Sequence, residues 1–163
     1  MYEDAPGRYS EEGQASLATG PSGTRGVMPI RVVLVDDNAG FRQRLARLLQ
    51  LQGGLEIAGE AADGREAITK ARELRPDVIL MDFRMTTMDG FTAARAILQD
   101  VPDVKIFMLT AYPGALDRAK VTSNGLQGLL IKDQPIPEII AAIRHSVGAV
   151  QPASDGVEAP PGR

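Results

Sequence analysis

The sequence predicts an α/β fold in which a five-stranded parallel sheet is covered by helices on both faces. Two observations indicate this fold. Five short apolar runs alternate with stretches of helical spacing, and four of the runs are apolar on both faces. The chain has 163 residues, of which 44% are hydrophobic, so we expect one folded domain around one core.

The five apolar runs are expected to form the strands. The first, third, fourth and fifth are rich in Val, Ile and Leu on both faces, as in the interior of a parallel sheet. The second run alternates more and is typical of an edge strand. In chain order the runs are IRVVLVD from Ile30, LEIAGEA from Leu55, DVILMD from Asp77, VKIFMLT from Val104 and GLLIK from Gly128.

Apolar residues with helical spacing follow each run and predict five helices. The second helix has a capping-box-like start at Asp63 and Glu66, the fourth is a weaker pattern over residues 114–124, and the fifth opens at Pro135. The stripes are Phe41, Leu45, Leu48 and Leu49 in the first helix; Ala67, Ile68, Ala71 and Leu74 in the second; Phe91, Ala94, Ile97 and Leu98 in the third; and Ile136, Ile139, Ile140, Ile143 and Val147 in the fifth.

The two ends of the chain differ from the middle in composition. Residues 1–28 and 149–163 are rich in Gly, Ser and Pro and lack periodic apolar residues, so we expect two disordered tails around a domain at 29–148. Met28 directly precedes the first strand, which suggests the hypothesis that it is the true start of the protein. No second domain is expected after the last helix.

Composition also excludes several classes of function. The chain has no cysteine, so disulfides and thiolate sites are excluded. No apolar run reaches the roughly 20 residues of a membrane helix, and the N-terminus does not resemble a signal peptide. We therefore expect a cytoplasmic protein without a membrane partner. The net charge is −3 and the 18 basic residues are scattered, so no DNA partner is expected.

Polar residues at the carboxyl ends of the predicted strands indicate a site. Asp36 and Asp37 end the first run, Asp82 ends the third, Thr110 the fourth and Lys132 the fifth. In open parallel sheets these ends share one edge, where ligands bind. Three carboxylates favour a hard divalent cation such as Mg²⁺, a lysine and a threonine suit phosphoryl oxygens, and an aspartate can serve as a nucleophile that takes up a phosphoryl group.

Each of these residues also has an ordinary structural explanation. Asp37 or Asn38 can cap the helix that begins near Ala39, and Asp82 can be a turn residue. Thr110 suits a strand, and Lys132 alone is typical of a solvated surface lysine. The combination, one polar group per strand end, is what favours a site. His145, the only histidine, is expected to be structural or exposed near the end of the last helix.

Four segments in this order resemble the receiver domain of response regulators, the phosphoacceptor half of two-component signalling. They are VVLVDDN, DVILMDFRMTTMDG, IFMLTAY and GLLIKD, and the resemblance covers about residues 30–147. It implies a flavodoxin-like, doubly wound sheet with strand order 2-1-3-4-5. With no second domain expected, the chain resembles the single-domain, chemotaxis-type regulators, whose output is binding of another protein, here an unknown one.

The resemblance also implies roles for individual residues. Asp82 is the phosphoacceptor and receives its phosphoryl group from a sensor histidine kinase or a phosphotransfer protein. Asp37, Asp82 and the backbone carbonyl of Arg84 bind Mg²⁺, and Asp36 acts through metal-bound water. Thr110 and Lys132 bind the phosphoryl group. No enzymatic activity is implied beyond assisting phosphotransfer to, and hydrolysis from, the protein's own aspartate.

Three positions depart from the family's usual pattern. Thr86 stands where a proline usually rigidifies the loop after the phosphoacceptor. Leu129 occupies the switch position, which usually holds a Tyr or Phe ring that moves inward on phosphorylation. Asp133 follows Lys132 where many members have proline, and a Lys-Asp pair is common among regulators that carry a C-terminal helix-turn-helix.

Two rival functions are considered beside the phosphorylation switch. A receiver-like module that binds a partner independently of phosphorylation is favoured by Leu129 and Thr86. A haloacid-dehalogenase-type phosphatase also uses Asp, Thr, Lys and Mg²⁺, but its nucleophile belongs to an acid-x-acid motif on the first strand. Asp36 and Asp37 are adjacent, so the phosphatase ranks last.

Overall fold

A computed structural model describes residues 28–148, in which five strands alternate with five helices. Residues 1–27 and 149–163 lie outside the described part, and so do the two disordered tails that the sequence predicts, apart from Met28. In chain order the elements are β1 Ile30–Val35, α1 Ala39–Gln50, β2 Leu55–Ala61, α2 Gly64–Leu74, β3 Val78–Asp82, α3 Gly90–Asp100, β4 Lys105–Thr110, α4 Arg118–Ser123, β5 Gly128–Ile131 and α5 Ile136–Ser146.

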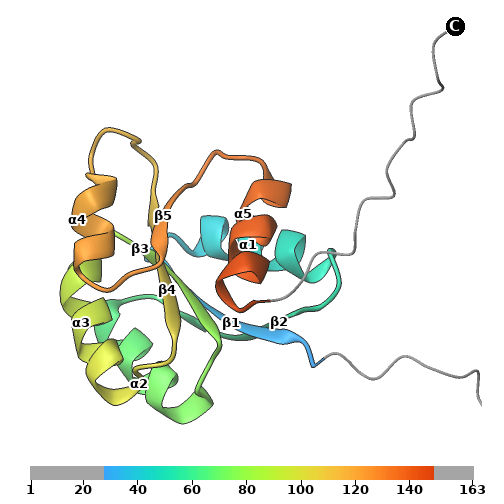
Figure 1. Ribbon diagram of the computed structural model, residues 1–163, viewed down its shortest axis with the longest axis horizontal. Helices are drawn as coiled ribbons and strands as arrows, with labels where there is room; N and C mark the ends of the chain where they lie inside the picture. The colour runs from blue at the N-terminus through green and yellow to red at the C-terminus, as the bar shows by residue number, and fades with distance from the viewer. Residues whose placement is uncertain (1–27, 149–163) are drawn as a thin grey trace, which may run out of the picture.

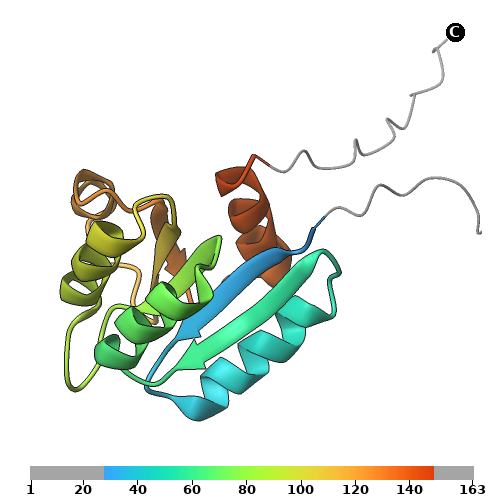
Figure 2. The ribbon, with the colours of Figure 1, turned by 90° about the horizontal axis from the view of Figure 1, so that it is seen from below.

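The five strands form one parallel sheet in the order β2-β1-β3-β4-β5, as predicted. Figure 1 shows α2, α3 and α4 on one side of this sheet and α1 and α5 on the other. β1 and β2 lie side by side, with β2 at the edge (Figure 2). From β1 the chain first adds β2 on one side and then β3, β4 and β5 on the other. The carboxyl ends of β1 and β3 therefore flank the topological switch point, where ligands bind in such sheets.

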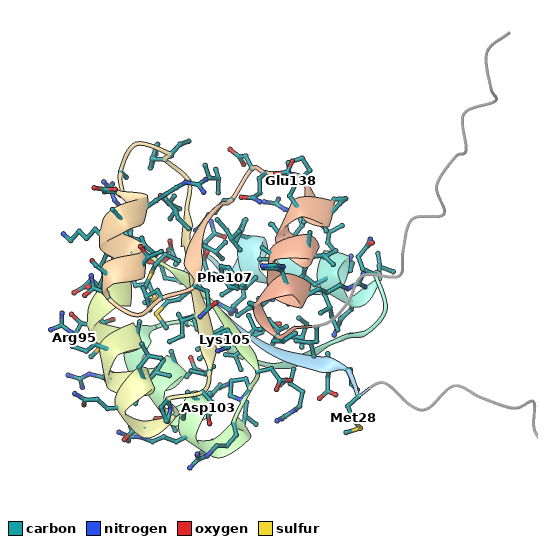
Figure 3. All side chains as sticks on the ribbon, viewed as in Figure 1. Met28, Arg95, Asp103, Lys105, Phe107 and Glu138 are labelled. Atoms are coloured by element: carbon teal, nitrogen blue, oxygen red, sulfur yellow. The ribbon has the colours of Figure 1, made fainter. Side chains whose placement is uncertain are left out.

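Each face of the sheet has its own apolar core. On the α1 and α5 side, Leu45 and Leu49 of α1 and Ile139 and Ile143 of α5 are buried against the strands. Phe107 of β4 belongs to this side and points between β4 and α5, whereas Arg95 of α3 lies on the solvent side of its helix (Figure 3). The core on the other side is built from small and branched residues of α2, α3 and α4, among them Ala67, Ala71, Ala93, Ala94, Ile97 and Val121.

Polar side chains begin four of the five helices. Asn38, Asp63, Asp89 and Asp117 cap α1, α2, α3 and α4, each accepting a hydrogen bond from a backbone N–H of the first turn. The predicted start of α2 is confirmed, with a variation. Glu66 donates its own N–H to Asp63 Oδ1 at 2.9 Å, and its carboxylate accepts from the N–H of Ala62 at 2.8 Å, one residue before the cap.

The structure corrects two details of the predicted helices. The fourth helix is shorter than residues 114–124, because Asp117 caps it and α4 begins only at Arg118. Residues 111–117 before it form turns and bends around Pro113 and Gly114. In α1, Leu48 is not part of the core: it is 36% exposed, while Leu45 and Leu49 are buried.

A β-bulge changes the pattern of the edge strand. Val32 of β1 pairs with Ile57, but the next residue, Val33, pairs with Gly59, so β2 contains one extra residue. The bulge shifts the alternation of faces beyond it. Ala61 therefore lies on the α2 side although Ile57, four residues earlier, lies on the α1 side. By the same shift Glu60 faces α1.

Candidate functional site

The three predicted acidic residues meet at the carboxyl edge of the sheet. Asp36 and Asp37 directly follow β1, and Asp82 is the last residue of β3. One carboxylate oxygen from each lies within 4.8 Å of the others. Asp36 and Asp82 are buried, at 1% and 5% exposure, whereas Asp37 is exposed. Two carboxylates of the cluster are therefore buried, and the third faces solvent.

Lys132, the residue after β5, reaches across the edge to this cluster. Its ammonium lies 2.6 Å from Asp36 Oδ2 and 3.4 Å from Asp82 Oδ1. It also lies 4.6 Å from the centre of the Phe41 ring, within the range of a cation–π interaction. The lysine side chain is only 15% exposed. The explanation of Lys132 as a solvated surface residue is therefore wrong.

The surroundings of Asp82 disfavour its negative charge. Burial raises the pKa of Asp82, and the nearby charge of Asp36 raises it further. The ammonium of Lys132 and the backbone N–H of Arg84, 3.4 Å from Asp82 Oδ1, oppose these effects. A nearby positive charge or a bound cation thus stabilises the ionised carboxylate, which is the nucleophilic form.

The residues present fit a divalent cation. Asp36 Oδ2 is the one buried side-chain oxygen or nitrogen, among residues 28–148, without a hydrogen-bond partner. Lys132 approaches it closely as an ion pair but outside hydrogen-bonding geometry. Within the described residues Lys132 is the only cation that forms an ion pair with any of the three carboxylates, and it pairs with Asp36 and Asp82 but not with Asp37. An oxygen-rich cluster with surplus negative charge is the donor set that Mg²⁺ and Ca²⁺ prefer.

The role of helix cap falls to Asn38. Its side chain accepts from the N–H of Phe41 at 2.9 Å, so Asp37 is not needed to cap α1. The Asp37 carboxylate accepts a long hydrogen bond from the hydroxyl of Thr86, at 3.5 Å from its Oδ2. Thr86, the residue that replaces the usual proline, therefore lies beside the exposed acid of the cluster.

The loop after β3 is held close to the strand end. Gly90 donates its N–H to the carbonyl of Phe83 at 3.1 Å. A Cβ atom at position 90 would lie 2.6 Å from the backbone oxygen of Asp82, so only glycine allows α3 to begin here. This loop carries the backbone of Arg84 past the Asp82 carboxylate, and the resemblance to receiver domains implies a ligand carbonyl at this residue.

Thr110 is at the predicted place, but its hydroxyl is occupied. It ends β4, is 4% exposed, and donates to the carbonyl of Tyr112 at 3.2 Å while accepting from the N–H of Tyr112 at 3.1 Å. Among its described contacts, none joins this hydroxyl to the acid cluster. Thr110 must therefore give up a local hydrogen bond to donate to a ligand at Asp82.

Leu129 lies inside the protein. It is 6% exposed, pairs with Met108 across β4 and β5, and belongs to the core on the α2, α3 and α4 side.

His145 is exposed near the end of α5, as expected.

Sequence reasoning missed three residues around the site. Phe41 packs under Lys132, and Arg42 donates to Glu60 Oε2 at 2.7 Å and to the backbone carbonyl of Asp36 at 2.6 Å. No site residue is predicted from the sequence at the end of the second strand, where Glu60 lies. The available signal was that Arg42 follows Phe41 and precedes Leu45, so it lies next to the apolar stripe of its helix. Glu60 could not be found, because the bulge reverses its face.

Comparison with known proteins gives response regulators. The chain is 38% identical over 125 residues to the transcriptional regulatory protein LnrK of Bacillus subtilis, covering 76% of this chain and 57% of LnrK. It is 37% identical over 119 residues to the response regulator protein VraR of Staphylococcus saprophyticus, covering 73% of this chain and 57% of VraR. The chain thus spans little more than half the length of these curated relatives.

Solved structures have the same fold. The signal receiver domain of the putative response regulator NarL from Mycobacterium tuberculosis superposes with a TM-score of 0.66 at 32% identity, covering 74% of this chain and 98% of that one. The response regulator domain of CheB from Thermotoga maritima superposes with a TM-score of 0.68 at 31% identity, covering 76% and 99%. Within residues 28–148, no helix has the length and apolar character needed to span a membrane.

These relatives correct one prediction. The expectation of no DNA partner is wrong for the proteins that the chain resembles, because LnrK is a transcriptional regulatory protein. The charge of −3 and the scattered basic residues describe only these 163 residues, which span little more than half the length of the curated relatives, so they could not exclude DNA binding by proteins of this kind. The Lys132-Asp133 pair was the signal in the sequence that pointed to such regulators.

A sequence model of a whole family also matches the chain. The sequence model of the response regulator receiver domain matches residues 32–144, more than two thirds of the chain. This range contains all five strands except the first two residues of β1, and every residue of the cluster at the carboxyl edge. The chain therefore belongs to the response regulator receiver domain family.

Proposed function

We propose that residues 29–148 form a phosphoacceptor receiver in a two-component system, phosphorylated on Asp82 in a Mg²⁺-dependent reaction. The observation that supports this most is the arrangement around Asp82. A buried carboxylate lies within 4.8 Å of two further acids and 3.4 Å from the Lys132 ammonium. The phosphodonor is a sensor histidine kinase or a phosphotransfer protein, acting in the cytoplasm.

The reaction moves one phosphoryl group. A carboxylate oxygen of Asp82 attacks the phosphorus of a phosphohistidine, a P–O bond forms, and the P–N bond to the imidazole breaks. The leaving imidazole takes a proton from solvent. Hydrolysis later replaces the aspartyl oxygen on phosphorus with water and returns Asp82 and inorganic phosphate. The protein assists both steps only on its own aspartate, so it does not turn over a separate substrate.

Asp37, Asp82 and the Arg84 carbonyl are proposed to hold Mg²⁺, with Asp36 acting through water. When bound, the ion neutralises charge on the phosphoryl oxygens and on the acids. Asp36 contributes a fixed, buried charge that orients Lys132. Lys132 binds a phosphoryl oxygen as a point charge, and Thr110 donates a hydrogen bond to another after leaving Tyr112.

Output is proposed to occur through contact with another protein or domain. Because LnrK is a transcriptional regulatory protein, a DNA-binding partner is the class that the relatives support. A second candidate is a module that binds its partner independently of phosphorylation. It is favoured by Leu129, which already fills the core in this structure.

Acetyl phosphate tests the proposal. The protein is incubated with acetyl phosphate and Mg²⁺ and its intact mass is measured. We expect one phosphoryl adduct in wild type, none in Asp82→Asn, and an unchanged adduct in Asp103→Asn, which removes an exposed acid at the opposite edge of the sheet. An adduct that persists in Asp82→Asn, or no adduct in wild type, would refute phosphorylation at Asp82.

A further inference from the structure

Arg42 joins three segments that meet behind the acid cluster. It belongs to α1, and its side chain is only 14% exposed. Its Nε donates to Glu60 Oε2 at the end of β2, at 2.7 Å. Its Nη1 donates to the backbone carbonyl of Asp36, in the turn that follows β1, at 2.6 Å. One guanidinium thus fixes the turn that carries both Asp36 and Asp37.

We propose that Arg42, held by Glu60, is a positioning residue that sets the geometry of the Asp36–Asp37 turn for cation binding and phosphoryl transfer. This inference rests on the proposed function. Arg42 contacts neither Asp37 nor the carboxylate oxygens of Asp36 through the hydrogen bonds described here. It acts through the Asp36 backbone.

The contacts of Asp36 show why its carbonyl matters. Its N–H donates to the carbonyl of Ala61 at 3.1 Å, and its Oδ1 accepts from the N–H of Asn38 at 2.8 Å. Its carbonyl accepts from Arg42, and its Oδ2 faces Lys132. Three of these contacts fix the residue's place, and Oδ2 is left for the site. Without Arg42 the carbonyl of Asp36 loses its hydrogen bond, and the residue keeps the contacts of its N–H, its Oδ1 and its Oδ2.

Arginine suits this position better than lysine. A guanidinium presents several N–H groups in a rigid plane and can donate to a carboxylate and a carbonyl at once, whereas an ammonium is a compact point charge. Burial strengthens both contacts, because little water competes for them. Arg42 also neutralises Glu60, so that the neighbouring strand adds no further negative charge beside the three acids.

The bulge in β2 makes this arrangement possible. The shift between Val32 and Val33 leaves Glu60 opposite Leu34 and on the face covered by α1. In an unbroken strand, Glu60 would face α2 and could not reach Arg42. The bulge places Glu60, Glu60 pairs with Arg42, and Arg42 holds the backbone of Asp36.

A matched ion pair elsewhere provides the control. Arg72 of α2 and Asp100 of α3 pair through Nε and a carboxylate oxygen at 2.6 Å, almost the same distance as in the Arg42–Glu60 pair. Their side chains are 59% and 38% exposed, and neither residue contacts the acid cluster. Arg72→Met removes the same group as Arg42→Met without touching the turn.

The test measures Mg²⁺ affinity in the absence of a phosphodonor, by titration of backbone amide shifts. We expect Arg42→Met to weaken Mg²⁺ binding about tenfold, as is typical for partners that orient metal ligands. In the metal-free protein, the amide signals of residues 36–38 should already shift. Arg72→Met should leave both the affinity and these signals unchanged. Acetyl phosphate labelling of Asp82 at saturating Mg²⁺ is followed in parallel.

Two further variants separate positioning from charge and from general stability. Arg42→Lys keeps the positive charge but not the two simultaneous contacts, so its affinity should fall close to that of Arg42→Met. Glu60→Gln keeps a hydrogen-bond acceptor at a residue whose side chain is 34% exposed, so this variant should fold. Its Mg²⁺ affinity should fall about threefold. If Arg42→Met does not fold, the Mg²⁺ affinity of Glu60→Gln decides whether the Arg42–Glu60 pair has a positioning role.

The outcomes are distinguishable. Wild type that neither binds Mg²⁺ nor takes up phosphate on Asp82 would refute the proposed function and this inference with it. Wild type that does both, with unchanged Mg²⁺ affinity in Arg42→Met and Glu60→Gln, would overturn the positioning role alone. Wild-type affinity in Arg42→Lys would also overturn it, because charge would then be sufficient.

Discussion

The two sides of the carboxyl edge differ in whether their polar groups already face the acid cluster. On the β1 and β3 side, Asp36 and Asp82 are buried, the turn of Asp36 is tied to β2 and α1, and Lys132 already lies between the two carboxylates. On the β4 and β5 side, the Thr110 hydroxyl is engaged with Tyr112, and Leu129 is packed into the core.

This difference suggests that capture and response are separate properties of the molecule. For the proposed binding of a cation and a phosphoryl group, the first side needs little rearrangement. The second must break a local hydrogen bond at Thr110 and has no aromatic side chain at position 129 to rearrange. A ligand can shift a conformational equilibrium only by its differential affinity for the two states, so we expect effective capture and a limited response.

The largest effect is expected from Lys132→Met. Removing the ammonium leaves the buried charge of Asp36 and the carboxylate of Asp82 without a positive partner. Breaking a buried ion pair typically costs about 3 kcal/mol in the free energy of unfolding. Urea denaturation at neutral pH measures the loss. Lys120→Met, which removes an exposed lysine 5.8 Å from the Phe91 ring, should cost under about 1 kcal/mol. Equal losses in the two variants would contradict the central place of Lys132.

Asp37→Ala should separate metal binding from stability. Asp37 is exposed and is proposed as a direct ligand, so Mg²⁺ affinity should fall by at least about tenfold. The metal-free protein should not lose stability, because one of three mutually repelling carboxylates is removed. Titration of amide shifts measures the affinity. Asp133→Ala, which removes an exposed acid beside Lys132, is the control, and unchanged Mg²⁺ binding in Asp37→Ala would exclude Asp37 as a ligand.

A smaller effect is expected from Asp89→Ala, in the framework below the site. Asp89 caps α3 and accepts from the N–H of Thr92 at 3.0 Å and from its hydroxyl at 2.7 Å. Loss of a helix cap costs about 1 kcal/mol at neutral pH. The Thr92 hydroxyl, and then its N–H, hold the pKa of Asp89 below its ordinary value.

The pH dependence of this loss follows from the lowered pKa. The stability that Asp89 contributes through its charge is present above the pKa of the unfolded chain and disappears as the pH falls through the lower folded value. The difference between wild type and Asp89→Ala should therefore shrink in acid. Urea denaturation at several pH values measures it, with Asp103→Ala as a control acid. A difference that does not change with pH would show that the charge of Asp89 has no part in the cap.

The sequence was sufficient for the sheet and for the residues at its edge. Apolar runs on both faces and helical stripes depend only on local periodicity, and parallel strands bring their carboxyl ends together whatever the loops do. Asp36, Asp37, Asp82, Thr110 and Lys132 accordingly lie at this edge. Their roles in binding Mg²⁺ and phosphate remain predictions that the experiments above test.

What the sequence could not give depends on irregular structure and on side-chain direction. The bulge in β2 reverses the face of Glu60, so the Arg42–Glu60 pair is invisible to alternation. Asp117 caps α4 later than the apolar pattern suggests. The orientation of the Thr110 hydroxyl toward Tyr112 depends on a turn whose backbone no periodicity describes.

The smallest and most specific effect concerns Leu129. In this family an aromatic ring at this position usually moves inward on phosphorylation, whereas Leu129 is already 6% exposed within the core. Its burial therefore changes little between the two states, and burial of apolar area is what would favour one of them. A tyrosine has a solvated hydroxyl in an outward position and a large ring to bury in an inward one.

We therefore expect Leu129→Tyr to enlarge the response of the β4 and β5 side. Beryllofluoride, which stands in for the phosphoryl group on Asp82, is added with Mg²⁺, and amide shifts are compared across residues 113–147. The shifts should be larger in Leu129→Tyr than in wild type, while Leu129→Met, which conserves volume, should behave as wild type. Inward packing of the larger ring costs about 1–3 kcal/mol where the core does not adapt, so the variant's stability is measured in the same samples. Wild-type shifts as large as those of the tyrosine variant would mean that Thr110 and its loop move this surface without help from position 129.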